Sequence, residues 1–141
     1  MSTFKILDGA MGSELIRWGM ELPEHIWSAA ANLTNPELVL KIHREYVDAG
    51  ADYITANTFR TTPRAFGKLD SLVAGSVEVN KKDAVLNSRN SLFTAVELAK
   101  EAARNSVKVL GSIASLEDCY SPELFPGKNT AITEFRQLGG W

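Results

Sequence analysis

An acidic residue, two glycines and a serine suited to cap a helix follow the first apolar run of the chain. The run is Phe4-Lys5-Ile6-Leu7, and the segment after it is Asp8-Gly9-Ala10-Met11-Gly12-Ser13. Glycine permits a tight turn and a close approach of the backbone to another molecule. The amides that open a following helix attract a small anionic group. The segment predicts a ligand-binding loop, and the alternative is a tight turn from strand to helix that binds nothing.

Further polar residues follow two other apolar runs. Asn57 and Thr58 come at the end of the run at 51–57, and Ser112 lies within the run at 107–113. In parallel sheets, ligands bind at the carboxyl ends of the strands. We therefore expect Asn57 and Thr58 to line a pocket floor and Ser112 to face the same end of the sheet. As alternatives, Asn57 and Thr58 bond their own backbone, and Ser112 serves packing alone.

The elements that must position these residues alternate between short apolar strands and helices. Strands are predicted over 4–8, 51–57 and 107–113. Helices are predicted over 13–18, from Thr34-Asn35-Pro36-Glu37 to Gly50, over 79–104 with a break near Asn87-Ser88, and from about Thr130. The segments 20–33, 58–75 and 115–128 are predicted as loops. This alternation indicates an α/β fold, with a parallel sheet of right-handed crossover units.

Two of these helices carry specific signals. Thr34-Asn35-Pro36-Glu37 offers a capping residue, a proline in the first turn and a glutamate placed for a capping box. Gly50 lies where a C-cap glycine belongs, and His43 is predicted to be structural or to face solvent. In the helix at 79–104, one apolar stripe is predicted from Leu92, Phe93, Val96, Ala99 and Ala103.

Composition excludes several classes of function. The 141 residues include 15 basic and 17 acidic ones, which gives a net charge of −2. This balance does not indicate a positively charged surface that would bind nucleic acid or an anionic membrane. No apolar run approaches the roughly 18 residues that span a bilayer, and the N-terminus does not resemble a secretory signal. Cys119 is the single cysteine, so no internal disulfide forms and a cytoplasmic location is expected.

Several motifs in order resemble the homocysteine S-methyltransferase family. That family includes betaine-dependent and S-methylmethionine-dependent enzymes and the homocysteine domain of cobalamin-dependent methionine synthase. The matching segments are Leu7–Leu15, Trp27-Ser28, Thr34–Val39, Ile42–Tyr46, Ala49–Arg60 and Gly111–Ala114. The likeness is weakest over 68–90. Arg60-Thr61-Thr62 and Leu116–Tyr120 are most similar to the S-methylmethionine-type branch.

The resemblance implies a (β/α)₈ TIM barrel about twice as long as this chain. Residues 1–141 then form the N-terminal portion of a homocysteine-binding domain, with about three βα units and a piece of the fourth helix. We expect such a truncated barrel to leave two open sheet edges, which favour self-association.

The resemblance also implies a chemistry. In the family, Zn²⁺ holds the sulfur of L-homocysteine as a thiolate, which attacks a methyl group on the donor. Three cysteines bind the metal there, and none of them matches a position in this sequence. We therefore assign no metal ligand here and expect the cysteine ligands in the missing C-terminal half. The implied donor is S-methylmethionine or S-adenosylmethionine.

Site residues follow from the same resemblance. The amides of the turn bind the carboxylate of homocysteine, Asp8 lies near its amino group, and Trp27 covers the substrate unless it merely packs under a loop. Arg60 stands where the betaine-dependent branch has a tyrosine, so betaine is disfavoured; otherwise Arg60 is a solvated or ion-paired loop residue. No catalytic residue is assigned. The implied substrate-binding set is Asp8, Gly9, Ala10, Met11, Trp27, Asn57, Thr58 and Ser112.

The sequence thus supports two leading hypotheses. The first is the N-terminal part of a zinc-dependent enzyme that methylates homocysteine to methionine. The second is an inactive fragment that at most binds a small anion or amino acid, or self-associates. An unrelated barrel enzyme with the same layout is a third, because fold alone does not settle function.

Overall fold

Three short chain segments run parallel to one another. The computed structural model describes residues 4–68 and 81–141. Strand β1 (Tyr53–Thr55) pairs in parallel with β2 (Lys108–Leu110), with Ile54 opposite Val109. The first predicted strand, 4–8, is reduced to a single parallel bridge between Leu7 and Tyr53. The parallel arrangement is confirmed, but β1 and β2 are shorter than the predicted runs.

Side-chain oxygens explain why the strands are short. At the end of β1, the backbone N–H of Thr55 donates to the carboxylate of Asp8, and the N–H of Ser112 beyond β2 donates to the hydroxyl of Thr58. At the start of the first segment, the N–H of Ile6 donates to the carboxylate of Asp52. These backbone groups are satisfied without a ladder partner.

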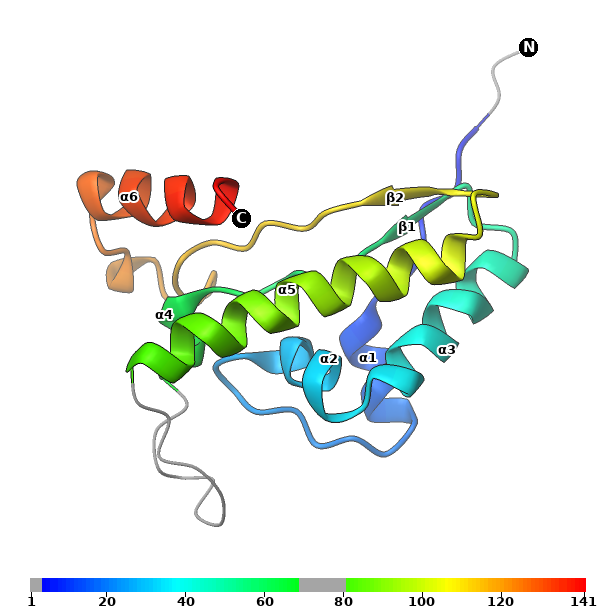
Figure 1. Ribbon diagram of the computed structural model, residues 1–141, viewed down its shortest axis with the longest axis horizontal. Coiled ribbons are helices and arrows are strands. Elements are labelled where there is room, and N and C mark those ends of the chain that lie inside the picture. The colour runs from blue at the N-terminus through cyan, green and yellow to red at the C-terminus, as the bar shows by residue number, and fades with distance from the viewer. Residues whose placement is uncertain (1–3, 69–80) are drawn as a thin grey trace.

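Most of the remaining chain is helical. The elements are α1 (Met11–Arg17), the 3-10 helix η1 (Trp27–Ala30), α2 (Ala31–Thr34), α3 (Pro36–Asp48), α4 (Pro63–Phe66), α5 (Lys81–Ala103), the 3-10 helix η2 (Pro122–Leu124) and α6 (Lys128–Gly139). Helix α5 packs against the sheet and against α2 and α3, and so lies between them (Figure 1). In the part of the chain that is described, no helix is long and apolar enough to cross a membrane.

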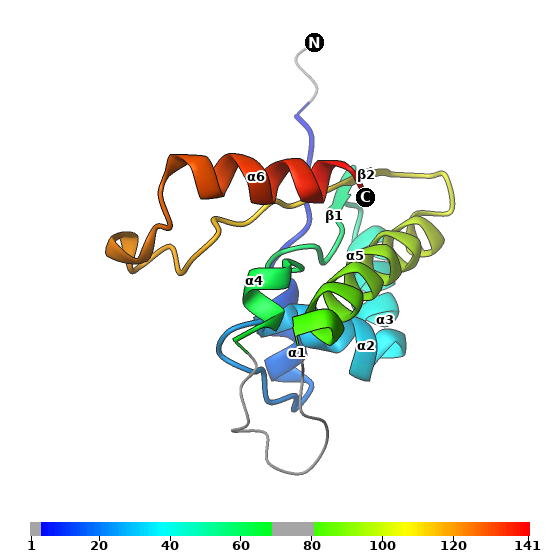
Figure 2. The same cartoon turned by 60° about the vertical axis from the view of Figure 1, so that its left-hand side comes forward.

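Helix α6 stands away from the rest. It lies apart from α3 and α5 in both views (Figures 1 and 2), and within the described residues it packs extensively against no other helix or strand. Its apolar side chains Ile132 and Phe135 are each 39% exposed. An ion pair between Glu134 and Arg64 of α4 joins α6 to the body of the protein.

Alanines allow α5 to lie close to the sheet. Ala99, Ala102 and Ala103 pack with Ile54 and Ala56 in one buried cluster. Ala99 and Ala103 belong to the predicted stripe, but Phe93 does not join it, because it is 44% exposed. The predicted break near Asn87-Ser88 is also wrong: α5 is continuous there, and the Ser88 hydroxyl donates to the carbonyl of Val85 within the helix.

Other helix ends confirm some signals and correct others. Helix α3 begins at Pro36 as predicted, and Gly50 just beyond its end has a left-handed φ of +98°. The capping prediction is wrong, because Asn35 makes no side-chain capping bond and the Thr34 hydroxyl donates back to the carbonyl of Ala30. Helix α1 begins two residues before Ser13.

The predicted loops contain short helices. The loop predicted over 20–33 contains η1 and the start of α2, and the loop at 58–75 contains α4. The loop predicted over 115–128 overlaps the start of helix α6, which begins at Lys128 and not near Thr130. Positions 69–75 of a predicted loop and 79–80 of a predicted helix lie outside the described residues.

His43 on α3 is fully buried, which overturns the solvent-facing alternative and leaves the structural one. Neither ring nitrogen has a hydrogen-bond partner among the described residues. Burial disfavours the charged imidazolium and lowers the pKa of His43 from 6.5 to about 4. The ring is therefore neutral in the folded protein at neutral pH.

This buried imidazole predicts a loss of stability on acidification. Because the folded-state pKa of His43 lies below that of the unfolded chain, the unfolded state takes up the proton first. The free energy of unfolding should fall as the pH drops from 6.5 to about 4 and level off below that. At roughly 1.4 kcal/mol per pKa unit, the full loss is about 3 kcal/mol.

Urea unfolding of wild-type protein and His43→Leu across this pH range measures the contribution. The leucine variant should lack this part of the pH dependence, whereas His25→Gln, which changes the other, exposed histidine, should retain it. Parallel pH curves for wild-type protein and His43→Leu would show that His43 does not titrate in this way.

Candidate functional site

The turn after Leu7 is anchored to β1 through Asp8. The Asp8 carboxylate accepts hydrogen bonds from the backbone N–H of Thr55 at 2.7 Å and from the Thr55 hydroxyl at 3.0 Å. The Asp8 N–H donates to the carbonyl of Tyr53 at 3.0 Å. Gly9 and Ala10 remain exposed to solvent. The turn is therefore anchored to β1 through Asp8, while Gly9 and Ala10 are accessible to solvent.

Two aromatic side chains lie against the glycines of this turn. A Cβ atom on Gly9 would be 2.6 Å from the hydroxyl oxygen of Tyr46, and one on Gly12 would be 2.4 Å from Nε1 of Trp27. Real Cβ atoms essentially never come so close to another heavy atom. Both positions therefore need glycine for the approach of an aromatic ring, a reason that the sequence pattern did not reveal.

Asn57 lies in a buried network of side-chain hydrogen bonds. Its Nδ2 donates to the carbonyl of Ser28 and to Oδ1 of Asn32, each at 2.8 Å, and its Oδ1 accepts from the Ser28 hydroxyl at 2.7 Å. Nδ2 of Asn32 donates to the carbonyl of Asn57 and to the hydroxyl of Ser91 on α5. The network joins the end of β1 to η1, α2 and α5.

Thr58 and Ser112 meet across the ends of β1 and β2. The Thr58 hydroxyl donates to the carbonyl of Ser112 at 2.7 Å and accepts from its N–H at 2.8 Å. It also lies 3.4 Å from the carbonyl of Ala56, the kind of contact expected if Thr58 bonds its own backbone. The structure thus brings Thr58 into contact with Ser112, and Trp27 into contact with the glycine turn. The side chain of Asn57 hydrogen-bonds Ser28, the residue next to Trp27.

A cavity of about 540 Å³ lies next to Trp27. The loops after β1 and β2, helix α4 and the chain before η1 contribute its walls. Of the eight predicted site residues, only Trp27 lines it, at 39% exposure. Sequence reasoning did not propose Phe59 or Tyr120 as site residues. Both lie in loops that follow strands, and this position was the available signal.

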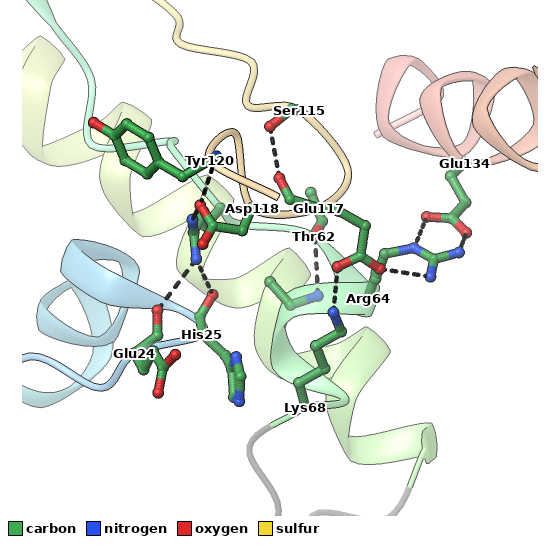
Figure 3. Close-up of polar contacts among 12 residues, drawn as sticks. Glu24, His25, Thr62, Arg64, Lys68, Ser115, Glu117, Asp118, Tyr120 and Glu134 are labelled. Atoms are coloured by element: carbon green, nitrogen blue, oxygen red, sulfur yellow. Dashed lines mark hydrogen bonds and ion pairs between the residues drawn. The ribbon is translucent and has the colours of Figure 1, made fainter. Parts of the chain in front are cut away.

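Ion pairs hold these walls together (Figure 3). The Arg64 guanidinium lies 3.0 Å from Glu117 and also pairs with Glu134, and Lys68 pairs with Glu117. Burial of Glu117 raises its pKa, but Lys68 and Arg64 outweigh burial and leave that pKa below its usual value. The charged carboxylate therefore fastens the loop after β2 to α4.

Among the residues that the structure describes, none form a metal centre. Within 4–68 and 81–141, no group of three or more His, Cys, Asp or Glu side chains could hold a metal ion. Cys119 is exposed in the loop after β2. These residues alone do not fit a zinc site.

Known proteins match this chain in sequence and in fold. A family model described as homocysteine S-methyltransferase matches residues 5–141, so the chain belongs to that family. It is 37% identical over 84 residues to homocysteine S-methyltransferase of Escherichia coli, covering 55% of this chain and 27% of the relative. It is 36% identical over 83 residues to selenocysteine Se-methyltransferase of Brassica oleracea var. italica, covering 54% and 24%.

A solved structure shows a similar fold. The homocysteine methyltransferase MmuM from E. coli, in its metallated form, superposes with a TM-score of 0.60 at 29% identity, covering 78% of this chain and 38% of that one. The chain thus spans between about a quarter and two fifths of the length of these relatives.

The contact between Trp27 and Gly12 predicts that Gly12→Ala displaces the indole. The added methyl would lie 2.4 Å from Nε1, and overpacking of this kind costs about 1–3 kcal/mol. In a background with Trp18 and Trp141 changed to Phe, the Trp27 emission should shift. Gly111→Ala is the matched control, because its Cβ meets nothing within 4 Å. Unchanged emission in Gly12→Ala would contradict the contact.

The buried amide network predicts that Asn57→Asp is strongly destabilising. Aspartate has the shape of asparagine but cannot donate to Ser28 and Asn32, and it buries a charge without a counter-ion. We expect a loss of about 3 kcal/mol in the free energy of unfolding, measured by urea denaturation. The exposed Asn129→Asp should stay within about 0.5 kcal/mol of wild type. Equal stability of the two variants would show that the network is not needed.

Proposed function

We propose that this chain is the N-terminal portion of a (β/α)₈ barrel that transfers a methyl group to the thiol of L-homocysteine, giving methionine. The observation that carries the proposal is the family match over residues 5–141. The open turn at Gly9 and Ala10, at the carboxyl end of the sheet, supports it.

The reaction we propose is a displacement at carbon. The sulfur of homocysteine attacks the methyl carbon of the donor, a new carbon–sulfur bond forms, and the bond between methyl and donor breaks. The leaving group keeps that electron pair, and the thiol proton passes to solvent. With S-methylmethionine both products are methionine, and with S-adenosylmethionine the second product is S-adenosylhomocysteine.

In this proposal the turn binds the amino-acid end of homocysteine. The backbone amides of Gly9, Ala10 and Met11 would bind the carboxylate, with Asp8 near the amino group. Asp8 already accepts two bonds from Thr55, and a carboxylate can accept more. Trp27 would cover the substrate, while Asn57, Thr58 and Ser112 hold the floor in position.

We propose Zn²⁺ as the cofactor of the complete barrel. Family membership and the metallated form of the E. coli structure support a metal. Bound zinc lowers the pKa of a thiol, which is about 8.5 when free. Since the described residues do not fit a zinc site, the proposal places cysteine ligands in polypeptide outside these 141 residues and assigns no step of metal chemistry to this chain.

A second candidate is that the chain by itself is inactive and self-associates. The observation that favours it is apolar surface at the sheet and on α6. Leu110 and Ile113 in and after β2 are 41% and 78% exposed, and Phe4 and Ile6 before the first bridge are more than half exposed. Exposed apolar patches of this kind are typical of association surfaces.

Methyl transfer can be tested with a donor whose S-methyl groups carry ¹³C. We expect no labelled methionine from the 141-residue chain alone, even with zinc. The chain fused to the C-terminal portion of the E. coli enzyme should form labelled methionine from homocysteine, whereas that C-terminal portion alone should not. A fusion that folds by circular dichroism and binds zinc, yet transfers no label from either donor, would contradict the proposed function.

A further inference from the structure

Trp27 has a backbone conformation that a bulky residue rarely adopts. Its φ is +47°, which lies in the left-handed region. In that region the Cβ of an L-residue crowds the backbone, so a residue of this size stays there only when its surroundings hold it. Backbone strain of this kind is concentrated at sites where a side chain is held for function. The contacts on either side of Trp27 therefore indicate what the strain serves.

Hydrogen bonds fix the chain before and after Trp27. Its own backbone N–H donates to the carbonyl of Pro23 at 2.7 Å. Ser28, the next residue, is bound twice by one side chain. Nδ2 of Asn57 donates to the Ser28 carbonyl at 2.8 Å, and Oδ1 of Asn57 accepts from the Ser28 hydroxyl at 2.7 Å. These two bonds, the Asn57–Ser28 clamp, set the path of the chain directly after Trp27.

The amide of Asn57 has no donor left for a ligand. One of its two N–H groups donates to the Ser28 carbonyl and the other to Oδ1 of Asn32. The residue is also only 4% exposed. Because the amide is buried and its donors are used, Asn57 can influence a bound molecule only through the residues that it holds.

The indole of Trp27 lies against the glycine turn. A Cβ atom on Gly12 would be 2.4 Å from Nε1 of Trp27 and 3.2 Å from its Cδ1. Gly12 directly follows the residues at 9–11, whose amides we propose to bind the carboxylate of homocysteine. Since ring and backbone are in contact, the position of the indole affects the shape of the turn.

We propose that Asn57 is a positioning residue, which acts through the Asn57–Ser28 clamp to keep Trp27 in its left-handed conformation and the indole against Gly12. This role rests on the proposed function and deepens it, because it names the group that keeps the homocysteine turn in its binding shape. Asn57 itself touches neither the substrate nor the reacting atoms.

Two buried serines of the same network provide a matched pair of variants. Ser28→Ala removes one bond of the clamp. Ser91→Ala removes a hydroxyl that donates to the carbonyl of Ala29 and accepts from Asn32, and leaves the clamp intact. Ser28 is 3% exposed and Ser91 is fully buried. Both variants should therefore lose stability, and only Ser28→Ala should release Trp27.

Quenching of the Trp27 emission by acrylamide measures this release in the 141-residue protein. In a background with Trp18 and Trp141 changed to Phe, Ser28→Ala should have a larger quenching constant and a red-shifted emission. Ser91→Ala should have the quenching constant of the background protein. Equal quenching of the folded background protein and Ser28→Ala would overturn the proposal, and so would an equal increase in both serine variants.

The strain at Trp27 can be tested by two substitutions that both remove the indole. Glycine adopts a φ of +47° freely, whereas alanine is crowded there. Trp27→Gly should therefore be more stable than Trp27→Ala in urea unfolding. Trp18, with a φ of −84°, is the control position, and there the glycine variant should not be the more stable one. A more stable alanine variant at both positions would overturn the proposal.

Kinetics of the methyltransferase fusion measure the consequence for binding. Ser28→Ala should raise the KM for homocysteine about fivefold, the contribution of one hydrogen bond, and leave kcat at saturating homocysteine unchanged. Ser91→Ala should leave KM and kcat as in wild type. A clamp that only stabilises the fold would instead reduce the amount of active enzyme and so lower kcat at constant KM. That result would overturn the positioning role.

The outcome is separable from that of the proposed function. If a folded, zinc-loaded fusion transfers no methyl group, methyl transfer is contradicted, while quenching and urea unfolding still decide whether the clamp holds Trp27. If the fusion forms labelled methionine with the same KM for homocysteine in wild type and Ser28→Ala, methyl transfer stands and the positioning role of Asn57 is removed.

Discussion

The bond between Asp8 and β1 is the constraint on which the candidate site depends. One carboxylate accepts both the backbone N–H and the hydroxyl of Thr55, and so continues the sheet where the ladder of the first segment has already ended. A charged acceptor makes such bonds stronger than those between neutral groups. Because the next residues are Gly9 and Ala10, this anchor decides where the exposed turn lies relative to the strand ends.

The same principle recurs at the other strand ends. The Thr58 hydroxyl bridges to both backbone groups of Ser112, and Asn57 uses its whole side-chain amide on Ser28 and Asn32. Short strands form few backbone hydrogen bonds with one another, so side chains bond the backbone groups beyond the strand ends. Polar residues at the carboxyl ends of the strands therefore have a structural role whether or not a ligand is present, and the binding role that we propose is additional to it.

How much could be predicted depended on whether a feature is set by residues close together in the sequence or by tertiary packing. Pro36 and Gly50 were placed correctly because helix starts and ends follow from the φ preferences of single residues. The break at Ser88 was wrongly predicted, because a serine hydroxyl can bond its own helix. Burial of His43 could not be predicted, since it depends on which face of α3 meets its neighbours.

By itself the sequence determined the alternation of the main strands and helices, their parallel arrangement and the resemblance to a methyltransferase family, because these follow from residue patterns along the chain. Only the tertiary structure decided that Gly9 and Gly12 give room to Tyr46 and Trp27, and that Arg60 and Trp27 meet at one cavity. Those contacts join residues from separate segments of the chain, and no local pattern specifies which side chains the fold will bring together.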